Sequence, residues 1–359
     1  MSIHAWGLRR ITMFCTIVAG LCAGLQAQAV RPASFARPQA GPYVHTIQSA
    51  SSADGINWTR DVGVRLNHAS VPSAAALPDS TIRLYYVDAD RGAGRPESTN
   101  CAVSADGITF KKAPITINGQ TAARILDPCI VTSGSQWLLY HLAASMGPAQ
   151  PSGSDINLAI SDDGIQFANM GTVFRYPGVV DPDVFHYRDR WFMYVFSEKQ
   201  TIIATSDNGT SFSYYGPLNL PGWGTTAPVP MPDGRLRLYA FEQHKSAGNK
   251  VGSFVSADGI NWLQETGERL VAASNEQITD PFVVRRGNGY KMYFKVQPVS
   301  QPPSAVRTQP QRQTQPVAKA QTKPARTQTR NKSQNKSKQN TSKNQSNNQK
   351  QGKNQKNNR

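Results

Sequence analysis

Short apolar runs separated by polar turns repeat along the chain, and no helical periodicity stands out beyond the N-terminal segment. Residues 180–212 show the pattern most completely, because VDPDVF, WFMYVF and IIAT alternate with polar turns and Phe212 begins a fourth run. β-Branched and aromatic residues dominate these runs, which favours β-strands. Four antiparallel strands in about 45 to 50 residues are typical of one blade of a β-propeller.

The turn before the fourth strand recurs as Ser-x-Asp/Asn-Gly-x-x-aromatic. It begins at Ser52, Ser104, Ser161, Ser206 and Ser256, at intervals of 52, 57, 45 and 50 residues. Ser and Asp side chains can accept hydrogen bonds from turn amides, and Gly supplies a positive φ. We therefore interpret these aspartates as turn-forming residues and assign them no catalytic role.

A second repeated feature is a step ending in proline, with a tyrosine 11 to 13 residues later on the following strand. The step is Asp-Pro in three repeats, at Asp127, Asp181 and Asp280, whereas the first repeat has Val71-Pro72. We expect the equivalent tyrosines to pack between blades; they are Tyr85, Tyr140, Tyr194, Tyr239 and Tyr293.

The two ends of the repeat region supply complementary half-blades. Residues 44–58 provide a third and a fourth strand, and residues 279–296 provide a first and a second. Pairing the two halves removes the open sheet edges that each would otherwise expose. The sequence therefore predicts an all-β fold, a five-bladed β-propeller over residues 43–297, closed by its N-terminal and C-terminal half-blades.

The N-terminal segment is typical of a secretory signal. Arg9 and Arg10 precede an apolar run over residues 11–25, and residues 27–29 offer a small-x-small cleavage site. An uncleaved anchor is the alternative, although the run is short for a membrane span. We expect a signal over residues 1–29, a linker over residues 30–42 and a secreted or periplasmic protein. Cys101 and Cys129 would then form either a disulfide between neighbouring blades or two buried thiols.

The formal net charge of +16 belongs to the C-terminal tail. Residues 301–359 contain 14 of the 39 Lys and Arg and no Asp or Glu, whereas residues 30–300 contain 23 basic and 23 acidic residues. Residues 298–359 are rich in Gln, Asn and Lys and are predicted to be disordered. This tail could solubilise the protein, or it could bind anionic polymers, a membrane surface or nucleic acid.

Five blades, Asp-Pro steps and S-x-D-G-x-x-W turns resemble the five-bladed glycoside hydrolase superfamily of arabinanases, β-xylosidases, invertases and levansucrases, families 43, 32, 62 and 68. The resemblance covers residues 43–296. It implies a base or nucleophile Asp on one blade, a pKa-tuning Asp on the next and an acid Glu on the blade after that. The first two match Asp127 and Asp181, but the third position reads Thr225-Thr226-Ala227-Pro228.

We expect the candidate site at one rim of the central funnel, where first strands begin and second strands end. Glycoside hydrolysis needs an acid and a second carboxylate, and crowded carboxylates raise one another's pKa. Asp127 and Asp181 are the catalytic candidates, with Glu198 or Glu242 as the acid. Candidate substrate contacts are Asp280, Asp183, Asp88, Trp223, His141 and His244. Turn-capping, packed or solvated roles are the alternative for each.

No paired histidines, Cys/His cluster or phosphate-binding glycine loop is present in the sequence, so we predict no metal and no cofactor. Inward carboxylates could nevertheless hold a Ca²⁺ at the axis. Three hypotheses follow. The first is an exported, monomeric glycoside hydrolase with a carbohydrate substrate. The second is a non-catalytic glycan-binding or cell-envelope-associated propeller, and the third is a protein that acts through its cationic tail.

Overall fold

The computed structural model describes residues 41–90, 97–122, 124–143, 155–198, 200–243 and 248–299. The expected signal, residues 30–40 of the linker, His244 and residues 300–359 of the tail lie outside these ranges. Within them, the helical content is one 3₁₀ turn, η1 (Gly41–Val44). No helix in the described ranges is therefore long and apolar enough to cross a membrane.

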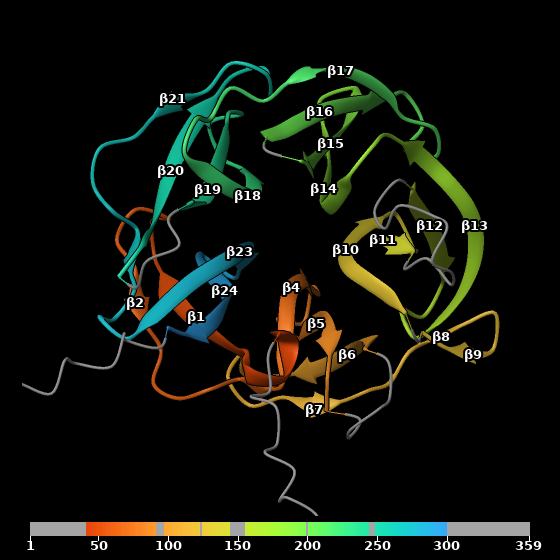
Figure 1. The fold of residues 1–359 in the computed structure, drawn as a ribbon, viewed down its shortest axis with the longest axis horizontal. Coiled ribbons are helices and arrows are strands. Elements are labelled where there is room, and N and C mark those ends of the chain that lie inside the picture. The colour runs from red at the N-terminus through yellow and green to blue at the C-terminus, as the bar shows by residue number, and fades with distance from the viewer. Residues whose placement is uncertain are drawn as a thin grey trace, which may run out of the picture. The chain divides into compact units, whose positions relative to one another are not determined.

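Five sheets, antiparallel except for one short parallel pairing at the outer edge of blade 2, are arranged radially around a central axis (Figure 1). Blade 1 contains β4 (Ala69–Ala76), β5 (Ile82–Asp88), β6 (Ser98–Ser104) and β7 (Lys111–Lys112). Blade 2 contains β10 (Ile125–Ser133), β11 (Gln136–Ala143), β12 (Asp155–Ser161) and β13 (Gln166–Arg175), with β8 (Thr116–Ile117) and β9 (Gln120–Thr121) at its outer edge. Blade 3 contains β14 (Val179–Tyr187), β15 (Arg190–Ser197), β16 (Gln200–Ser206) and β17 (Ser213–Pro217). Blade 4 contains β18 (Trp223–Pro230), β19 (Leu236–Glu242), β20 (Lys250–Ser256), β21 (Leu263–Gln264) and β22 (Leu270–Val271).

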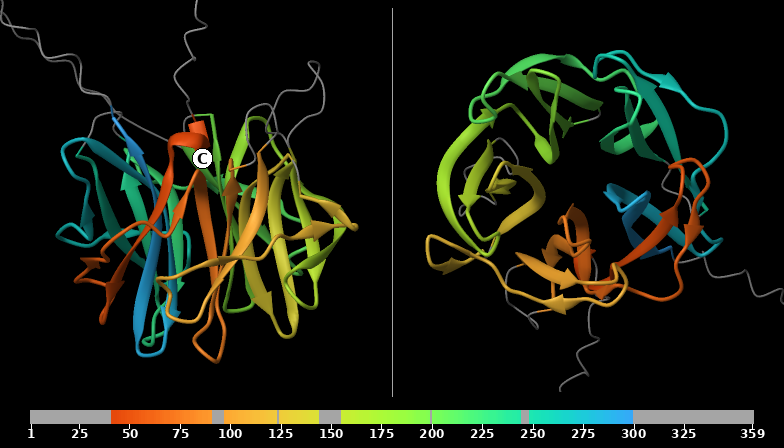
Figure 2. Two further views of the ribbon diagram at one scale, coloured as in Figure 1. Left: turned by 90° about the horizontal axis from the view of Figure 1, so that it is seen from below. Right: turned by 180° about the vertical axis from the view of Figure 1, so that it is seen from behind.

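Blade 5 is assembled from both ends of the described chain. Its strands are β23 (Glu276–Arg286), β24 (Gly289–Pro298), β1 (Thr46–Ser52), β2 (Thr59–Arg60) and β3 (Leu66–Asn67). β1 pairs antiparallel with β24, with Thr46 opposite Val296 and Ser52 opposite Tyr290. Figure 2 shows this junction as the orange and blue strands that lie side by side. The predicted five-bladed propeller, closed by two half-blades, is confirmed.

A repeated hydrogen bond, equivalent in all five blades, joins each blade to the next in the ring. In blade 2, the hydroxyl of Tyr140 donates to the carbonyl oxygen of Gly209 in blade 3, at 2.8 Å. The four other tyrosines at this position make the same contact: Tyr85 with Gly164 (2.7 Å), Tyr194 with Gly259, Tyr239 with Gly55 (2.8 Å) and Tyr293 with Gly107 (3.1 Å). All five tyrosine side chains are fully buried. The predicted packing of these tyrosines between blades is confirmed.

The repeated turn motif presents the glycine carbonyl that accepts this hydrogen bond. In blade 3, Ser206 Oγ accepts from the Gly209 N–H at 3.0 Å, and Asn208 Oδ1 accepts from the Thr210 N–H at 2.9 Å. Gly209 has a φ of 73°, and a Cβ there would lie 2.9 Å from the Trp191 ring, so the position requires glycine. The motif therefore builds the turn and connects the blades, as the turn-forming interpretation requires.

Cys101 and Cys129 are free thiols. Cys101 lies on β6 and Cys129 on β10, in different hydrophobic clusters. The Cys129 sulfur accepts a hydrogen bond from the Val184 N–H on the neighbouring inner strand at 3.1 Å. Of the two alternatives from the sequence, the structure has the buried thiols.

Candidate active site

The inner strands β4, β10, β14, β18 and β23 each carry a register irregularity near their first residues. In four of them the bulged residue precedes proline and adopts a left-handed backbone, with φ of 47° at Val71, 49° at Asp127, 51° at Asp181 and 50° at Asp280. Aspartate tolerates this conformation better than most residues. A bulge turns its side chain out of the ladder. The three aspartates therefore lie at the mouth of the axial channel.

Thr225 occupies the fifth equivalent position. Ala227 lies opposite Tyr239 on β19, just as Cys129 lies opposite the equivalent Tyr140 on β11. Thr225 and Asp127 each come two residues before these positions, so they are equivalent. The hydroxyl of Thr225 donates to Asp280 Oδ1 at 2.9 Å. The position that the resemblance assigns to an acid is thus filled by a neutral hydrogen-bond donor.

Asp127 and Asp181 form a close pair on neighbouring blades. The backbone N–H of Asp181 donates to Asp127 Oδ2 at 3.3 Å. Loss of solvation at the channel mouth raises the pKa of Asp127 to about 6, with repulsion from Asp280 adding to the rise and the Asp181 N–H opposing it. The pKa of Asp181 is raised well above its usual value. Loss of solvation is the main cause, and repulsion from Asp127 and Asp280 adds to it. Since the N–H stabilises the ionised form of Asp127, Asp181 holds a proton more readily than Asp127 does.

Lys295 provides a cation within this carboxylate cluster. Its Nζ lies 2.5 Å from Asp280 Oδ2, and both side chains are largely buried. Burial lowers the pKa of Lys295, but attraction by Asp280, Asp181 and Asp127 outweighs it and raises the pKa above its usual value. The ammonium group therefore stays charged, and the cluster contains three carboxyl groups and one cation.

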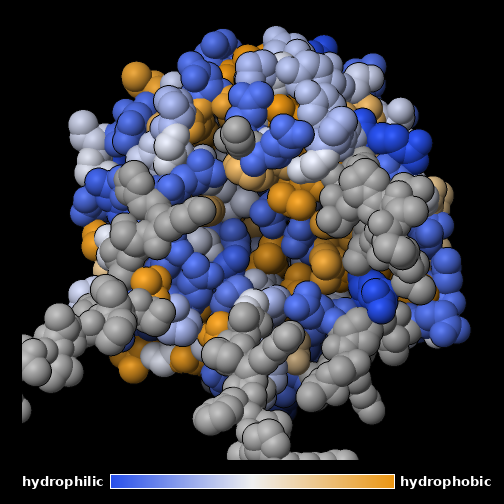
Figure 3. All heavy atoms as spheres, viewed as in Figure 1, coloured by the Kyte–Doolittle hydropathy of each residue, from blue (hydrophilic) through white to orange (hydrophobic). Residues whose placement is uncertain are grey.

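Asp183 lies one layer below this ring. Its side chain is buried, and its Oδ2 accepts a hydrogen bond from the Thr226 hydroxyl at 3.1 Å. Burial raises the pKa of Asp183 well above its usual value. Asp183 and Asp181 help to line an axial cavity of about 30 Å³, which has room for about one or two water molecules. A sugar ring would therefore have to bind above this cavity, in the hollow at the centre of the face shown in Figure 3.

The structure places the other carboxylate candidates apart from this cluster. Asp88 is buried and accepts from Asn100 Nδ2 at 2.8 Å, with Lys112 Nζ at 3.3 Å. Glu198 is exposed in the turn between β15 and β16, with a φ of 52°. Glu242 ends β19, and its Oε1 lies 4.0 Å from Lys250 Nζ on β20. These three side chains take part neither in the hydrogen bond between Asp181 and Asp127 nor in the ion pair between Asp280 and Lys295.

The aromatic and histidine candidates also differ from expectation in their positions. His141 is only 3% exposed, and burial lowers its pKa to about 4, so it lies inside blade 2 rather than open at the rim. Trp223 packs on the side of blade 4, with its ring centroid 5.4 Å from that of Phe254. His244 lies outside the described residues.

Three residues near the cluster were not among the sequence candidates: Lys295, Glu97 and His45. Glu97 precedes β6 at the same rim, and its charge contributes to the raised pKa of Asp127. His45 precedes β1, with its Nδ1 3.1 Å from Ser70 Oγ; burial, helped by Lys295, lowers its pKa to about 4. A sequence signal for Lys295 exists, because it is a charged residue two positions after the repeated tyrosine. The other blades have apolar residues there: Val87, Leu142, Phe196 and Phe241.

Within the described ranges, no group of three or more His, Cys, Asp or Glu side chains is arranged to hold a metal ion. The axial carboxylates instead surround the Lys295 ammonium group. An axial Ca²⁺ would therefore face a cation that is already part of the cluster.

Comparison with solved structures identifies the architecture. A thermostable family-43 glycoside hydrolase superposes with a TM-score of 0.50 at 11% identity, over 65% of this chain and 95% of its own. The chain shares the five-bladed propeller fold of this glycoside hydrolase. An α-L-arabinofuranosidase from Clostridium thermocellum matches with a TM-score of 0.48 at 16% identity, over 63% of this chain and 81% of its own. A family-32 β-fructofuranosidase from Bombyx mori matches with a TM-score of 0.49 at 12% identity, over 70% of this chain and 57% of its own.

Comparison of the sequence itself adds no relative. No protein-family model matches the chain, and no curated protein does. The likeness to solved structures concerns the fold alone, so any activity has to be argued from the residues at the channel mouth.

Proposed function

We propose that this protein is an exported glycoside hydrolase that acts at the mouth of the axial channel through Asp127 and Asp181. One observation carries the proposal: the Asp127 carboxylate accepts a hydrogen bond from the backbone N–H of Asp181, and both carboxyl groups have raised pKa values. Two neighbouring carboxyl groups in different protonation states are what glycoside hydrolysis requires. Because the site lies at a rim, a carbohydrate chain can reach it from solvent.

In the proposed reaction, Asp181 carries the proton and donates it to the glycosidic oxygen as the bond to the anomeric carbon breaks. Asp127, ionised above about pH 6, activates a water molecule or attacks the anomeric carbon. The carboxylate of Asp280 stabilises the positive charge that develops on the sugar ring. Lys295 is paired with Asp280 and limits the repulsion among the three carboxylates.

This assignment gives Asp181 the acid role that the resemblance gives to a glutamate on the next blade. Thr225 occupies that position and cannot donate a proton of suitable acidity. Glu198, Glu242 and Glu97 lie at strand ends on the same rim and are the alternative acids. Replacing each of them by glutamine tests this alternative directly.

A non-catalytic glycan-binding propeller is the second candidate, because Thr225 replaces the acid and Lys295 is paired with one of the carboxylates. In that case the same mouth would bind a sugar without cleaving it. The cationic tail would hold the protein to a cell envelope or to another anionic surface.

The test is hydrolysis of a panel of aryl glycosides and plant polysaccharides by the wild-type chain, Asp127→Asn and Asp181→Asn. Asparagine tolerates the left-handed backbone, so each change removes charge with little strain. We expect at least a 1,000-fold lower rate on polysaccharide for both variants. Asp207→Asn, at an exposed turn of the same blade as Asp181, is the matched control. Binding without hydrolysis by the wild type would favour the second candidate.

A further inference from the structure

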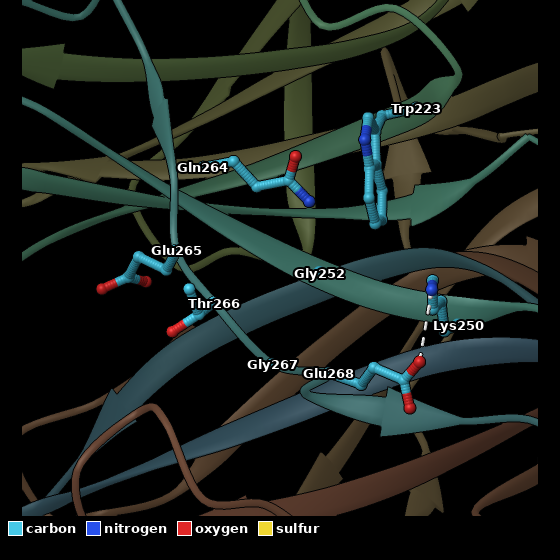
Figure 4. Close-up of a pocket in the computed structure, with 8 residues that line it drawn as sticks. All are labelled: Trp223, Lys250, Gly252, Gln264, Glu265, Thr266, Gly267 and Glu268. Atoms are coloured by element: carbon cyan, nitrogen blue, oxygen red, sulfur yellow. Dashed lines mark hydrogen bonds and ion pairs between the residues drawn. The ribbon is translucent and has the colours of Figure 1, made fainter.

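A second pocket lies on the side of blade 4, away from the axial channel. It has a volume of about 680 Å³ and is lined by residues that include Trp223, Lys250, Gln264 and Glu268. This volume is within the range of ligand-binding pockets, which is about 300 to 1,000 Å³. Figure 4 shows the indole of Trp223 at one side of this pocket and the Gln264 side chain extending toward it.

Gly252 on β20 allows the indole to lie directly against the strand. A Cβ at Gly252 would lie 2.5 Å from the indole Cη2, so any other residue would displace the ring. Glycine inside a strand weakens the strand and often marks a close approach by another group. Phe254 supports the ring at nearly a right angle, with an interplanar angle of 83°. The indole is therefore held in a fixed orientation while it contributes to the pocket wall.

The polar groups of the pocket are suited to forming hydrogen bonds with the hydroxyl groups of a ligand. Lys250 Nζ lies 3.2 Å from Glu268 Oε1 and 4.0 Å from Glu242 Oε1, so its charge is already balanced. Gln264 is exposed and offers both a donor and an acceptor. An anionic ligand would meet no uncompensated positive charge here. A fully apolar ligand would leave these polar groups without water.

We propose that this pocket is a second carbohydrate-binding site, which takes a neutral sugar with the C–H face of its ring stacked on Trp223. The electron-rich face of an aromatic ring attracts polarised C–H groups, and Gln264, Lys250 and Glu268 bind the hydroxyls. The ligand class rests on the proposed function. The site would hold a polysaccharide while its chain end is processed at the axial channel, and so raise the local substrate concentration.

The test measures binding of linear arabinan, xylan and mannan by affinity electrophoresis, in the full chain with Asp181→Asn to prevent hydrolysis. In this background, Trp223→Ala should weaken binding of at least one polysaccharide by tenfold or more. Gln264→Ala should weaken it about threefold. Tyr214→Ala, at an exposed aromatic residue of β17, is the matched control and should bind as the parent does.

Thermal unfolding of each variant separates loss of binding from loss of folding. If Trp223→Ala does not fold, Gln264→Ala and Glu268→Ala carry the test, because both side chains are exposed. Unchanged binding in the folded variants, or no binding of any of the three polysaccharides by the parent, would overturn the site. If the wild type hydrolyses polysaccharide but the pocket variants bind it as well as the parent does, the second site is refuted and the proposed function is not. If binding depends on Trp223 but the wild type hydrolyses none of the polysaccharides, the proposed function is refuted and the second site is not.

Discussion

The Asp127 carboxylate accepts a hydrogen bond from the backbone N–H of Asp181, 3.3 Å away on the neighbouring blade. The contact links two strand bulges and places the Asp127 carboxylate against the backbone of Asp181 at the channel mouth. Loss of solvation raises the pKa of both carboxyl groups, and repulsion from Asp127 adds to the rise at Asp181. The pair therefore has consequences for stability as well as for activity.

Removing one charge of the pair should change how stability depends on pH. The folded pKa of Asp127, about 6, lies above the usual value of 3.8, so the folded state binds more protons than the unfolded state between these pH values. The contribution of the pair to stability is therefore present at low pH and decreases as pH rises through about 6. Relative to Asp127→Asn, the wild type should lose about 1 to 3 kcal/mol between pH 4.5 and 7. Urea unfolding at both pH values measures this difference, and an equal difference at both would contradict the raised pKa of Asp127.

Removing Lys295 should destabilise the propeller most at neutral pH. Lys295→Gln leaves three partly or fully buried carboxyl groups without their cation, which costs about 3 to 5 kcal/mol when a buried pair is broken. At pH 4.5 Asp127 and Asp181 are more protonated because their pKa values are raised, so the loss should be smaller. Urea unfolding gives both values. The double variant Lys295→Gln with Asp280→Asn should recover part of the loss, and no recovery would mean that the ion pair is not the cause.

The hydrogen bond between blades should contribute measurably to stability. Tyr140→Phe removes the donor and leaves the Gly209 carbonyl buried without it, so the free energy of unfolding should fall by about 1 to 2 kcal/mol. Tyr215→Phe, at a half-exposed tyrosine on β17, is the control and should change it by less than about 0.5 kcal/mol. Equal effects of the two changes would show that the tyrosines act through packing alone.

Val71 should be a site of backbone strain. It has a φ of 47°, which is unusual for a β-branched residue, at the position where three other blades have aspartate. Val71→Asn should therefore raise the free energy of unfolding by about 1 kcal/mol, because asparagine tolerates this conformation. Val71→Ala is the control, since alanine keeps the unfavourable φ and should not stabilise. A loss of stability in Val71→Asn would mean that packing of the valine outweighs the strain.

The architecture was predictable because its signals are local and repeated. The five Ser-x-Asp/Asn-Gly turns and the tyrosines such as Tyr140 recur at regular intervals, and the unpaired ends at residues 44–58 and 279–296 complement each other. Repetition of this kind fixes the number of strands and their pairing. It also identified Asp127, Asp181 and Asp280 as equivalent positions.

The details of the site were less predictable because they depend on backbone direction and on neighbouring blades. The left-handed bulges that aim Asp127 and Asp181 have no separate sequence signal beyond the following proline. His141 and Trp223 lie near strand ends, yet their side chains pack inside blade 2 and against blade 4. Lys295 joins the cluster from β24, because its pairing with β23 places Lys295 opposite Thr279 and beside Asp280.

The most direct test of the central claim compares two leaving groups. An aryl glycoside with an acidic phenol as leaving group needs little help from a general acid, whereas a natural glycan needs it fully. We predict that Asp181→Asn retains at least a tenth of the wild-type kcat on the activated substrate but loses at least 1,000-fold on the glycan, and that Asp127→Asn loses both activities. Equal losses on both substrates in Asp181→Asn, or unchanged hydrolysis in either variant, would contradict the assigned roles.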